Sequence, residues 1–195
     1  MCIRDRFYFS LTALNTLFSR HALVIHDAER LPIHGGSLRL FISLAAAKRE
    51  PSAAVIRLLA EERAWGAATW DAYRDFGARV DALKTSLCTL LKKLKCENKR
   101  IAAYGASAKG STLLNYFGVG RETLDFVADR STVKQGRYTP GTHLPIVPPE
   151  KLLEEQPDYV LLLTWNFADE ILKQQDEYRK RGGRFIVPIP FLQVV

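Results

Sequence analysis

From residue 98 to the end of the chain, short apolar runs alternate with stretches of helical spacing, and this alternation restricts the possible folds more than any other feature. Apolar runs that are continuous, and that helices separate, are typical of a parallel sheet covered on both faces. We therefore predict a Rossmann-like α/β domain over residues 98–195. The expected strands lie at residues 100–105, 124–129, 158–165 and 184–190. The expected helices lie at residues 108–117, 148–156 and 167–182.

Residues 1–97 are organised differently. Ser10 is a good cap for a short helix that reaches about His21, and two strand-like runs follow at residues 22–33 and 37–45, joined by a glycine-rich turn. A helix and a hairpin of about 47 residues are too small for a core of their own. We therefore expect this segment to be the end of something larger, and the natural chain to be longer than the printed sequence.

A long stretch of helical spacing connects these two parts. It begins after Pro51 and continues to Lys95, and Gly66 and Gly77 are expected to divide it into two helices. Its apolar stripe is most simply a packing face. A helical surface that pairs with another chain is the alternative.

Composition narrows the class of protein. The chain has 195 residues, of which 47% are hydrophobic, so it can form one or two domains with a real core. Its 28 Lys and Arg residues against 21 Asp and Glu residues give a net charge of +7, which favours an anionic partner. The three cysteines form no CxxC pair, so neither a disulfide framework nor a metal site is expected. Because no membrane span or signal peptide is recognisable, we expect a cytoplasmic protein with no membrane partner.

The turn after the first strand of the predicted sheet is the usual phosphate cradle of such folds. Here Gly105 and Gly110 match the first and third glycines of the dinucleotide fingerprint, but Ser107 replaces the second. The middle glycine normally lets a pyrophosphate lie against the backbone, so Ser107 argues against ordinary NAD binding. It leaves room for a phosphate that accepts a hydrogen bond from the hydroxyl. The order and spacing also fail to match a Walker P-loop.

Lys109 falls in the first turn of the following helix, where the helix dipole disfavours a cation by up to about 1 kcal/mol. An anion bound at the helix N-terminus offsets this cost, and Ser107 as a possible N-cap would help to form such a site. The alternative is a solvated lysine on a surface turn.

Further candidates follow the next strands. Asp129 stands where Rossmann folds place the acid that binds a ribose, although it can equally be a turn residue or the partner of an arginine. The glycine- and proline-bent loop that follows is either a bland basic loop or a lid that donates charge and hydrogen bonds to a phosphorylated ligand. The loop candidates are Lys134, Arg137, Tyr138 and His143, and Trp165 with Asn166 is expected to complete the rim beyond the third strand.

Several motifs together resemble the C-terminal domain of the SAM-dependent sugar C-methyltransferases. They are "YGASAKGSTLLNYFGV", "DRSTVKQGRYTPGTHLPI", "DYVLLLTWNFADEI" and "GGRFIVPIP", which spread over residues 98–190. Upstream, "YFSLTAL" and "ERLPIHGGSLRLFIS" look like the closing segment of that family's methyltransferase domain. The resemblance implies three parts: the end of a SAM methyltransferase domain at residues 1–47, a helical connector at 48–97, and a Rossmann-like substrate-binding domain at 98–195.

In that family a zinc-binding domain and a SAM-binding domain precede the portion present here. The resemblance implies a methyltransferase that adds a methyl group to a carbon of a nucleotide-linked keto-deoxysugar, with SAM bound by the upstream domain. This chain would bind the nucleotide diphosphate sugar and would be inactive alone. The family has a Glu-His pair, associated with the catalytic base, at the positions of Arg4 and Asp5, so no catalytic residue is assigned here. The residues expected at the substrate are Gly105, Ser107, Lys109, Gly110, Asn115, Asp129, Lys134, Arg137, Tyr138, His143, Trp165 and Asn166.

Two other classes of function compete with this reading. An NAD(P)-binding oxidoreductase or dinucleotide-binding module is favoured by Asp129 and opposed by Ser107. A non-catalytic interaction domain would use the helices at residues 52–95, but it leaves the anion-friendly turn unexplained. Nucleic acid is not expected as a partner, because the basic residues are dispersed. The sequence favours no particular oligomeric state.

Overall fold

The computed structural model describes residues 8–33 and 36–195 and divides the chain into two compact units. We call residues 1–79 the first unit and residues 80–195 the second unit. The division falls inside a long helix, whose later turns pack on the sheet of the second unit. The three-part division expected from the sequence, at residues 47 and 97, stays a prediction.

The first unit is built on a two-stranded antiparallel ribbon. Helix α1 (Leu11–Ser19) begins at Ser10, whose hydroxyl accepts a hydrogen bond from the Ala13 N–H at 3.1 Å, so the expected cap is confirmed. Strand β1 (Leu23–Leu31) pairs with β2 (Ser37–Leu44), which confirms the predicted hairpin. Residues 34 and 35 of the predicted turn lie outside the described residues.

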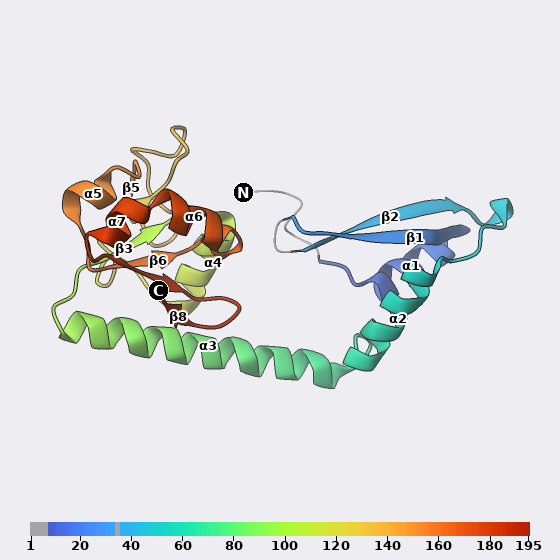
Figure 1. Ribbon diagram of the computed structural model, residues 1–195. Coiled ribbons are helices and arrows are strands. Elements are labelled where there is room, and N and C mark those ends of the chain that lie inside the picture. The colour runs from blue at the N-terminus through green and yellow to red at the C-terminus, as the bar shows by residue number, and fades with distance from the viewer. Residues whose placement is uncertain (1–7, 34–35) are drawn as a thin grey trace. The chain divides into compact units, whose positions relative to one another are not determined.

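Helices pack beside β1 in the first unit (Figure 1). A short 3-10 helix η2 (Ala45–Ala47) precedes α2 (Ala53–Trp65), which Ser52 caps. The Glu62 carboxylate of α2 accepts hydrogen bonds from the first backbone N–H groups of α1. The buried apolar residues of this unit's core cluster are Leu11, Ile25, Ala28, Val55 and Leu58.

The predicted break at Gly66 is confirmed, but the one at Gly77 is wrong. Gly66 ends α2 with a φ of +85°, a backbone conformation that favours glycine. Helix α3 (Trp70–Cys96) instead continues through Gly77. A single glycine inside a helix costs only about 1 kcal/mol, and 27 residues of otherwise favourable helix offset it.

The second unit contains a six-stranded sheet in the order β5-β4-β3-β6-β7-β8. All neighbouring strands are parallel except β8, which is antiparallel to β7. The strands are β3 (Ile101–Tyr104), β4 (Val127–Ala128), β5 (Ile146–Val147), β6 (Tyr159–Leu162), β7 (Arg184–Val187) and β8 (Gln193–Val194). The Rossmann-like α/β architecture is therefore confirmed.

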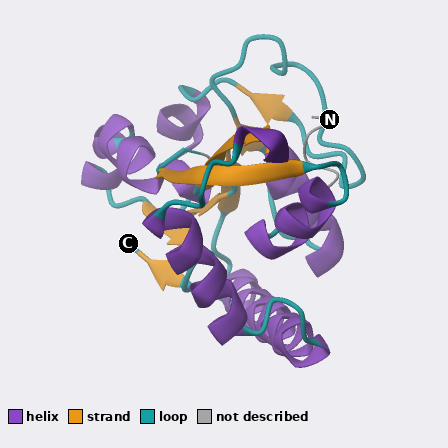
Figure 2. Ribbon diagram, turned by 90° about the vertical axis from the view of Figure 1, so that its right-hand side faces the viewer, coloured by secondary structure: helices purple, strands orange, loops and turns teal. Residues whose placement is uncertain are grey.

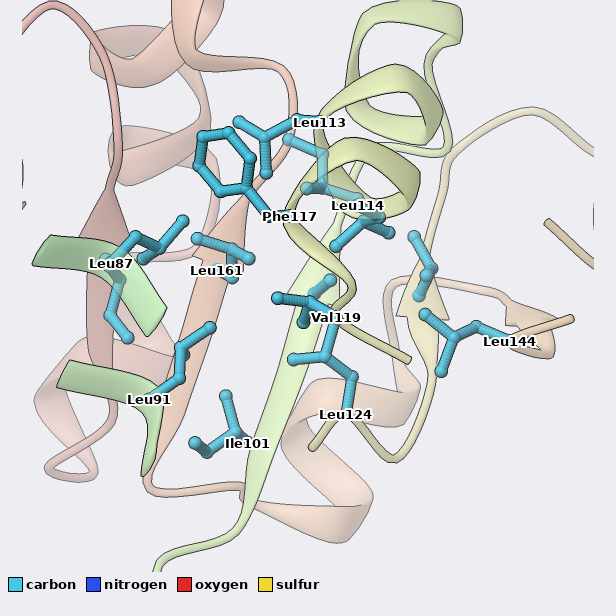
Figure 3. Packing of buried hydrophobic residues seen from close by; sticks show 14 of the residues in the cluster. Leu87, Leu91, Ile101, Leu113, Leu114, Phe117, Val119, Leu124, Leu144 and Leu161 are labelled. Carbon is cyan, nitrogen blue, oxygen red and sulfur yellow. The ribbon is translucent and has the colours of Figure 1, made fainter. Parts of the chain in front are cut away.

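Helices cover both faces of this sheet (Figure 2, helices in purple). One face packs on α4 (Ala108–Phe117) and on the last turns of α3, through Leu87, Leu91 and Leu114 (Figure 3). The other face packs on short helices. These helices are α5 (Lys151–Glu155), α6 (Ala168–Gln174) and α7 (Asp176–Lys180), and a 3-10 helix η3 (Trp165–Phe167) precedes α6.

The differences from the predicted elements are small and local. Strands β5 and β8 were not predicted, because two residues carry no periodic pattern. The single helix predicted at residues 167–182 is two helices, α6 and α7, with a break at Gln175. Among the described residues, no helix combines the length and the apolar character needed to cross a bilayer.

Candidate functional site

The turn after β3 brings two strand ends into close contact. Gly105 has a φ of +90°, and a Cβ atom placed there would lie 2.4 Å from Oγ1 of Thr164, which follows β6. The Gly105 N–H donates to the Ala128 carbonyl of β4 at 2.7 Å. Because a side chain would clash and the backbone is left-handed, only glycine fits here. The loops after β3, β4 and β6 therefore meet at Gly105.

Ser107 and Gly110 form the start of α4. The Ser107 hydroxyl accepts the Gly110 N–H at 3.0 Å and donates to the Leu163 carbonyl at 3.1 Å, which confirms it as the N-cap. A Cβ at Gly110 would lie 2.6 Å from the Leu163 Cβ. Gly110 thus lets the helix approach β6, as the third glycine of the fingerprint does. The Ser107 hydroxyl already donates its hydrogen to the Leu163 carbonyl, and Gly110 has no side chain. Ser107 and Gly110 therefore mainly determine the shape of the site, and they offer a ligand few new side-chain hydrogen bonds.

Lys109 lies in the first turn of α4 and is exposed. Its ammonium nitrogen is 5.7 Å from the centre of the Trp165 ring, a cation–π distance. The first turn of α4 has no acidic residue, and no carboxylate of the described residues forms an ion pair with Lys109. The structure thus brings these two predicted residues together and leaves a cation beside the positive end of a helix. Such an arrangement is suited to an anion.

Asp129 fixes the loop beyond β4. Its carboxylate accepts the Ala106 N–H at 2.7 Å, the Ser131 N–H at 2.7 Å and the Lys134 ammonium at 3.2 Å. Lys134 also donates to the Ala106 carbonyl at 2.9 Å. Asp129 is only 8% exposed, so its carboxylate mainly ties the turn after β3 to the following loop.

A pocket of about 260 Å³ lies beside the Gly105–Thr164 contact, at the carboxyl ends of three strands. Tyr104 and Thr164 line it, and the side-chain oxygens of both are buried without a hydrogen-bond partner among the described residues. Outside the lining of this pocket, the Nδ2 atom of Asn166 is also buried without a hydrogen-bond partner among the described residues. The other lining residues are Gly105, Asp129, Arg130, Phe167, Glu170, Ile171 and Gln174.

Sequence reasoning missed most of this pocket. Tyr104 ends β3 and Thr164 follows β6, so a polar residue at the carboxyl end of each of two neighbouring strands was the available signal. Burial raises the pKa of Tyr104 above its ordinary value, which further favours the protonated hydroxyl. The positive charge of Arg130 and then the Gln175 side chain partly oppose this shift in the pKa of Tyr104.

Three predicted site residues lie elsewhere. Asn115, Tyr138 and His143 line a separate, open hollow of about 740 Å³, formed by the end of α4, the segment before β4 and the loop before β5. There the Arg121 guanidinium lies 5.5 Å from the Tyr138 ring, and its Nε donates to the His143 carbonyl at 2.6 Å. This is the amino end of the strands, whereas Lys109 lies at the carboxyl end. Tyr138 and His143 therefore do not lie at the sheet edge where the loop was expected, and the role of all three residues at a substrate stays a prediction.

The cause is the path of the loop. After Lys134 the chain turns back beside β5, where the Gly136 N–H donates to the Ile146 carbonyl and the Ile146 N–H donates to the Arg137 carbonyl. The loop therefore starts at the carboxyl end of the sheet and finishes at its amino end. Arg137 lies between the two ends and is exposed.

The site at the carboxyl ends combines cations, a helix N-terminus and unpaired hydrogen-bonding groups. This set can bind and orient an anionic ligand. Among residues 8–33 and 36–195, no cluster of His, Cys, Asp and Glu has the makings of a metal site.

Comparisons with known proteins agree with the family expected from the sequence. The family model described as "C-methyltransferase C-terminal domain" matches residues 32–190. The chain is 42% identical over 188 residues to the C-methyltransferase NovU of Streptomyces niveus. The match covers 96% of this chain but 45% of that relative, so the chain spans less than half of the relative's length.

Proposed function

Because the chain belongs to the family of C-methyltransferase C-terminal domains, we propose that it is the substrate-holding part of a SAM-dependent enzyme. The enzyme adds a methyl group to a carbon of a nucleotide-linked keto-deoxysugar. The chain binds the nucleotide diphosphate sugar through its second unit, and it acts with a methyltransferase domain that binds SAM.

Lys109, at the N-terminus of α4 and without an ion-pair partner in the part of the chain that the structure describes, carries this proposal. The Gly110 N–H is already bound to the Ser107 hydroxyl, but the positive end of the α4 dipole and the Lys109 ammonium together still favour a diphosphate, which is the charged part of a nucleotide sugar. Trp165 contributes an aromatic face 5.7 Å from the Lys109 ammonium nitrogen. Lys134 lies near the same turn, but its ammonium pairs with the Asp129 carboxylate at 3.2 Å, so Lys109 carries the uncompensated positive charge of the site.

The methyl donor itself suits this site poorly. SAM carries a positive sulfonium, which Lys109 and the positive end of α4 would repel. We therefore place no step through SAM in the second unit. When bound to its own domain, SAM supplies the methyl group.

Methylation next to a keto group requires removal of a proton and stabilisation of the negative charge that develops on oxygen. The contribution of this chain is to hold the nucleotide so that the reacting carbon is presented in a fixed orientation, a positional effect that can supply a large part of a rate enhancement. No residue of the described part is assigned as the catalytic base. The chain alone should bind substrate without turnover.

Isothermal titration of the 195-residue chain with a thymidine diphosphate sugar tests the proposal. Lys109→Ala should weaken binding roughly 10- to 100-fold, the value of a hydrogen bond to a charged group. Lys92→Ala is the matched control, because Lys92 is an exposed lysine on α3 away from the site, and it should change nothing. Absence of binding by the wild-type chain would contradict the proposal.

The same titration with NAD tests the other candidate. The Rossmann-like position of Asp129 favours a dinucleotide, whereas the donors already bound to its carboxylate oppose a ribose partner. Tight binding of NAD without binding of the nucleotide sugar would replace the proposed function with a dinucleotide-binding one.

A further inference from the structure

The open hollow at the amino end of the strands is distinct from the turn that holds Lys109 and from the pocket beside Thr164. It lies between the end of α4 and the loop before β5, and its volume is about 740 Å³. Complete small-molecule sites usually measure about 300 to 1,000 Å³. The hollow is therefore large enough for a whole small ligand, and the proposed function assigns it none.

Arg121 determines the chemistry of this hollow. Its Nε–H donates to the His143 carbonyl at 2.6 Å, and its guanidinium carbon lies 5.5 Å from the centre of the Tyr138 ring. These two contacts hold the guanidinium in a defined orientation. Stacking on an aromatic ring occupies a face of the planar guanidinium and leaves the N–H groups at its edge available for other bonds.

The positive charge of Arg121 has no partner in the part of the chain that the structure describes. No carboxylate there forms an ion pair with it, and its two terminal NH2 groups donate to none of the described residues. Glu122 also lines the hollow, but its carboxylate accepts the Gly120 N–H at 2.8 Å and the Thr123 hydroxyl at 3.2 Å. An anion that enters the hollow therefore meets a guanidinium with unoccupied donors.

The loop beside the hollow is held in place before any ligand arrives. The Asn115 amide of α4 donates to the Pro140 carbonyl at 3.0 Å, and a Cβ atom at Gly141 would clash with that amide. His143 has a φ of +53°, an unusual conformation for a residue other than glycine, and its N–H donates to the Thr139 carbonyl. Backbone strain of this kind gathers at ligand sites. A wall that is already ordered lowers the cost of binding.

We propose that the hollow is a second ligand site of the second unit, and that it binds a small organic anion whose carboxylate or phosphate group pairs with the edge of the Arg121 guanidinium. Such groups match the guanidinium fork with two parallel, charge-assisted hydrogen bonds. The Tyr138 ring is 60% exposed, and together with the floor of Leu114 and Val119 it suits an apolar ligand body. This site is independent of the proposed function, because Lys109 lies at the carboxyl end of the strands.

Nuclear magnetic resonance of the backbone amides tests the location and the ligand class. The 195-residue chain is titrated with benzoate and with phenyl phosphate, and saturable shifts are expected at residues 118–122 and 138–143. Acetate should bind more weakly there, because it lacks an apolar body. Binding of benzoate alone would assign a carboxylate, and binding of phenyl phosphate alone would assign a phosphate. If neither probe causes saturable shifts at these residues, the proposal is overturned.

Substitutions of Arg121 separate its hydrogen-bonding fork from its charge. Arg121→Gln removes both, so binding of the probes should weaken roughly 10- to 100-fold. Arg121→Lys keeps the charge without the fork and should still weaken binding roughly 3- to 10-fold. Tyr138→Leu removes the ring that orients the guanidinium, and a loss of roughly 2- to 5-fold is expected from one exposed cation–π contact.

Arg184→Gln is the matched control, because Arg184 is an exposed arginine at the start of β7 that does not line the hollow, and it should leave binding of the probes unchanged. Arg121→Gln should not change the binding of a thymidine diphosphate sugar. If Arg121→Gln binds both probes as tightly as the wild-type chain does, the second site is overturned and the proposed function stands. If it weakens the nucleotide sugar as much as the probes, the hollow is part of the substrate site and the proposal of a second site is wrong.

Discussion

The two units differ in how completely each encloses its apolar residues. Among the described residues of the first unit, a two-stranded ribbon and its helices bury a cluster of five apolar residues. In the second unit both faces of a six-stranded sheet are covered, with clusters of fifteen and ten buried residues. Two-stranded sheets are marginal by themselves, whereas a doubly covered sheet can hold loop ends in fixed positions. The candidate site lies on the unit with the more rigid framework.

The largest expected effect compares the two cores directly. Leu161→Ala, in the middle of the second unit, should lower the free energy of unfolding by about 4 kcal/mol, because neighbours on all sides cannot close the cavity. Leu58→Ala, in the smaller core of the first unit, should cost about 2 kcal/mol. Urea unfolding followed by circular dichroism measures both values. A larger loss for Leu58→Ala would invert the comparison.

Within the second unit, the contact that shapes the site should be more sensitive than an ordinary helix end. Gly105→Ala should cost about 3 kcal/mol, because it adds a clash with Thr164 to an unfavourable backbone conformation. Gly118→Ala, at the end of α4, has a φ of +68° but nothing within 4 Å of the new Cβ, so it should cost about 1 kcal/mol. Thermal unfolding of the two variants separates the clash from the backbone strain. Equal losses would show that the close approach to Thr164 is unimportant.

The anchoring of the loop after β4 should have an intermediate effect. Asp129→Asn removes the ion pair with Lys134 and weakens the bonds to two backbone N–H groups, so it should cost about 2 kcal/mol. Asp169→Asn changes an exposed carboxylate in the first turn of α6 and should cost a few tenths of a kcal/mol. Chemical unfolding of both variants is the measurement. If the two losses are alike, Asp129 does not anchor the loop.

The smallest expected effect is on the stability of the fold at low pH. Each unit contains one carboxylate with a lowered pKa that can be used to test it. The Arg100 backbone N–H, at 2.8 Å, and then Lys99 lower the pKa of Asp158 in the second unit. The Ser52 hydroxyl and then the Ala28 N–H lower the pKa of Asp27 in the first unit.

A lowered pKa in the folded state means that the ionised carboxylate stabilises the fold above its ordinary pKa of 3.8, and that this stabilisation is lost as pH falls through the lower, folded-state value. Asp158→Asn should therefore flatten the loss of stability below about pH 4 in the second unit, and Asp27→Asn should do so in the first. Melting temperatures measured from pH 7 to pH 2 test both variants. If the melting temperature of a variant falls with pH as steeply as that of the wild-type chain, the replaced carboxylate does not stabilise its unit.

The secondary structure was predicted most accurately from the sequence where several local signals agree with each other. Helix α4 was predicted with its observed bounds, because Ser107 caps it, Gly118 ends it in a left-handed conformation and apolar residues repeat along one face. The parallel sheet followed from apolar runs that are buried on both faces. Gly77 misled the prediction because helix context outweighs the small cost of one glycine.

The site was only partly predictable from the sequence. The residue types after β4 do not indicate in which direction the loop runs along the sheet. Lys134 stays near the turn after β3 through Asp129, but pairing with β5 carries Tyr138 and His143 to the opposite end of the sheet. Strand β5 has two residues and left no periodic signal from which to infer this path. The pocket near Tyr104 was missed for a related reason: it is formed by the ends of three strands that are distant in sequence.

Hydrogen–deuterium exchange of the 195-residue chain, with and without a thymidine diphosphate sugar, tests most directly that the ligand site belongs to the second unit. We predict slower exchange on binding at residues 104–112, which include the N-terminus of α4, and at residues 163–175, which include η3 and α6. The amides of the first unit should exchange at unchanged rates. Protection confined to the first unit, or to the hollow near Tyr138 and His143, would contradict the account.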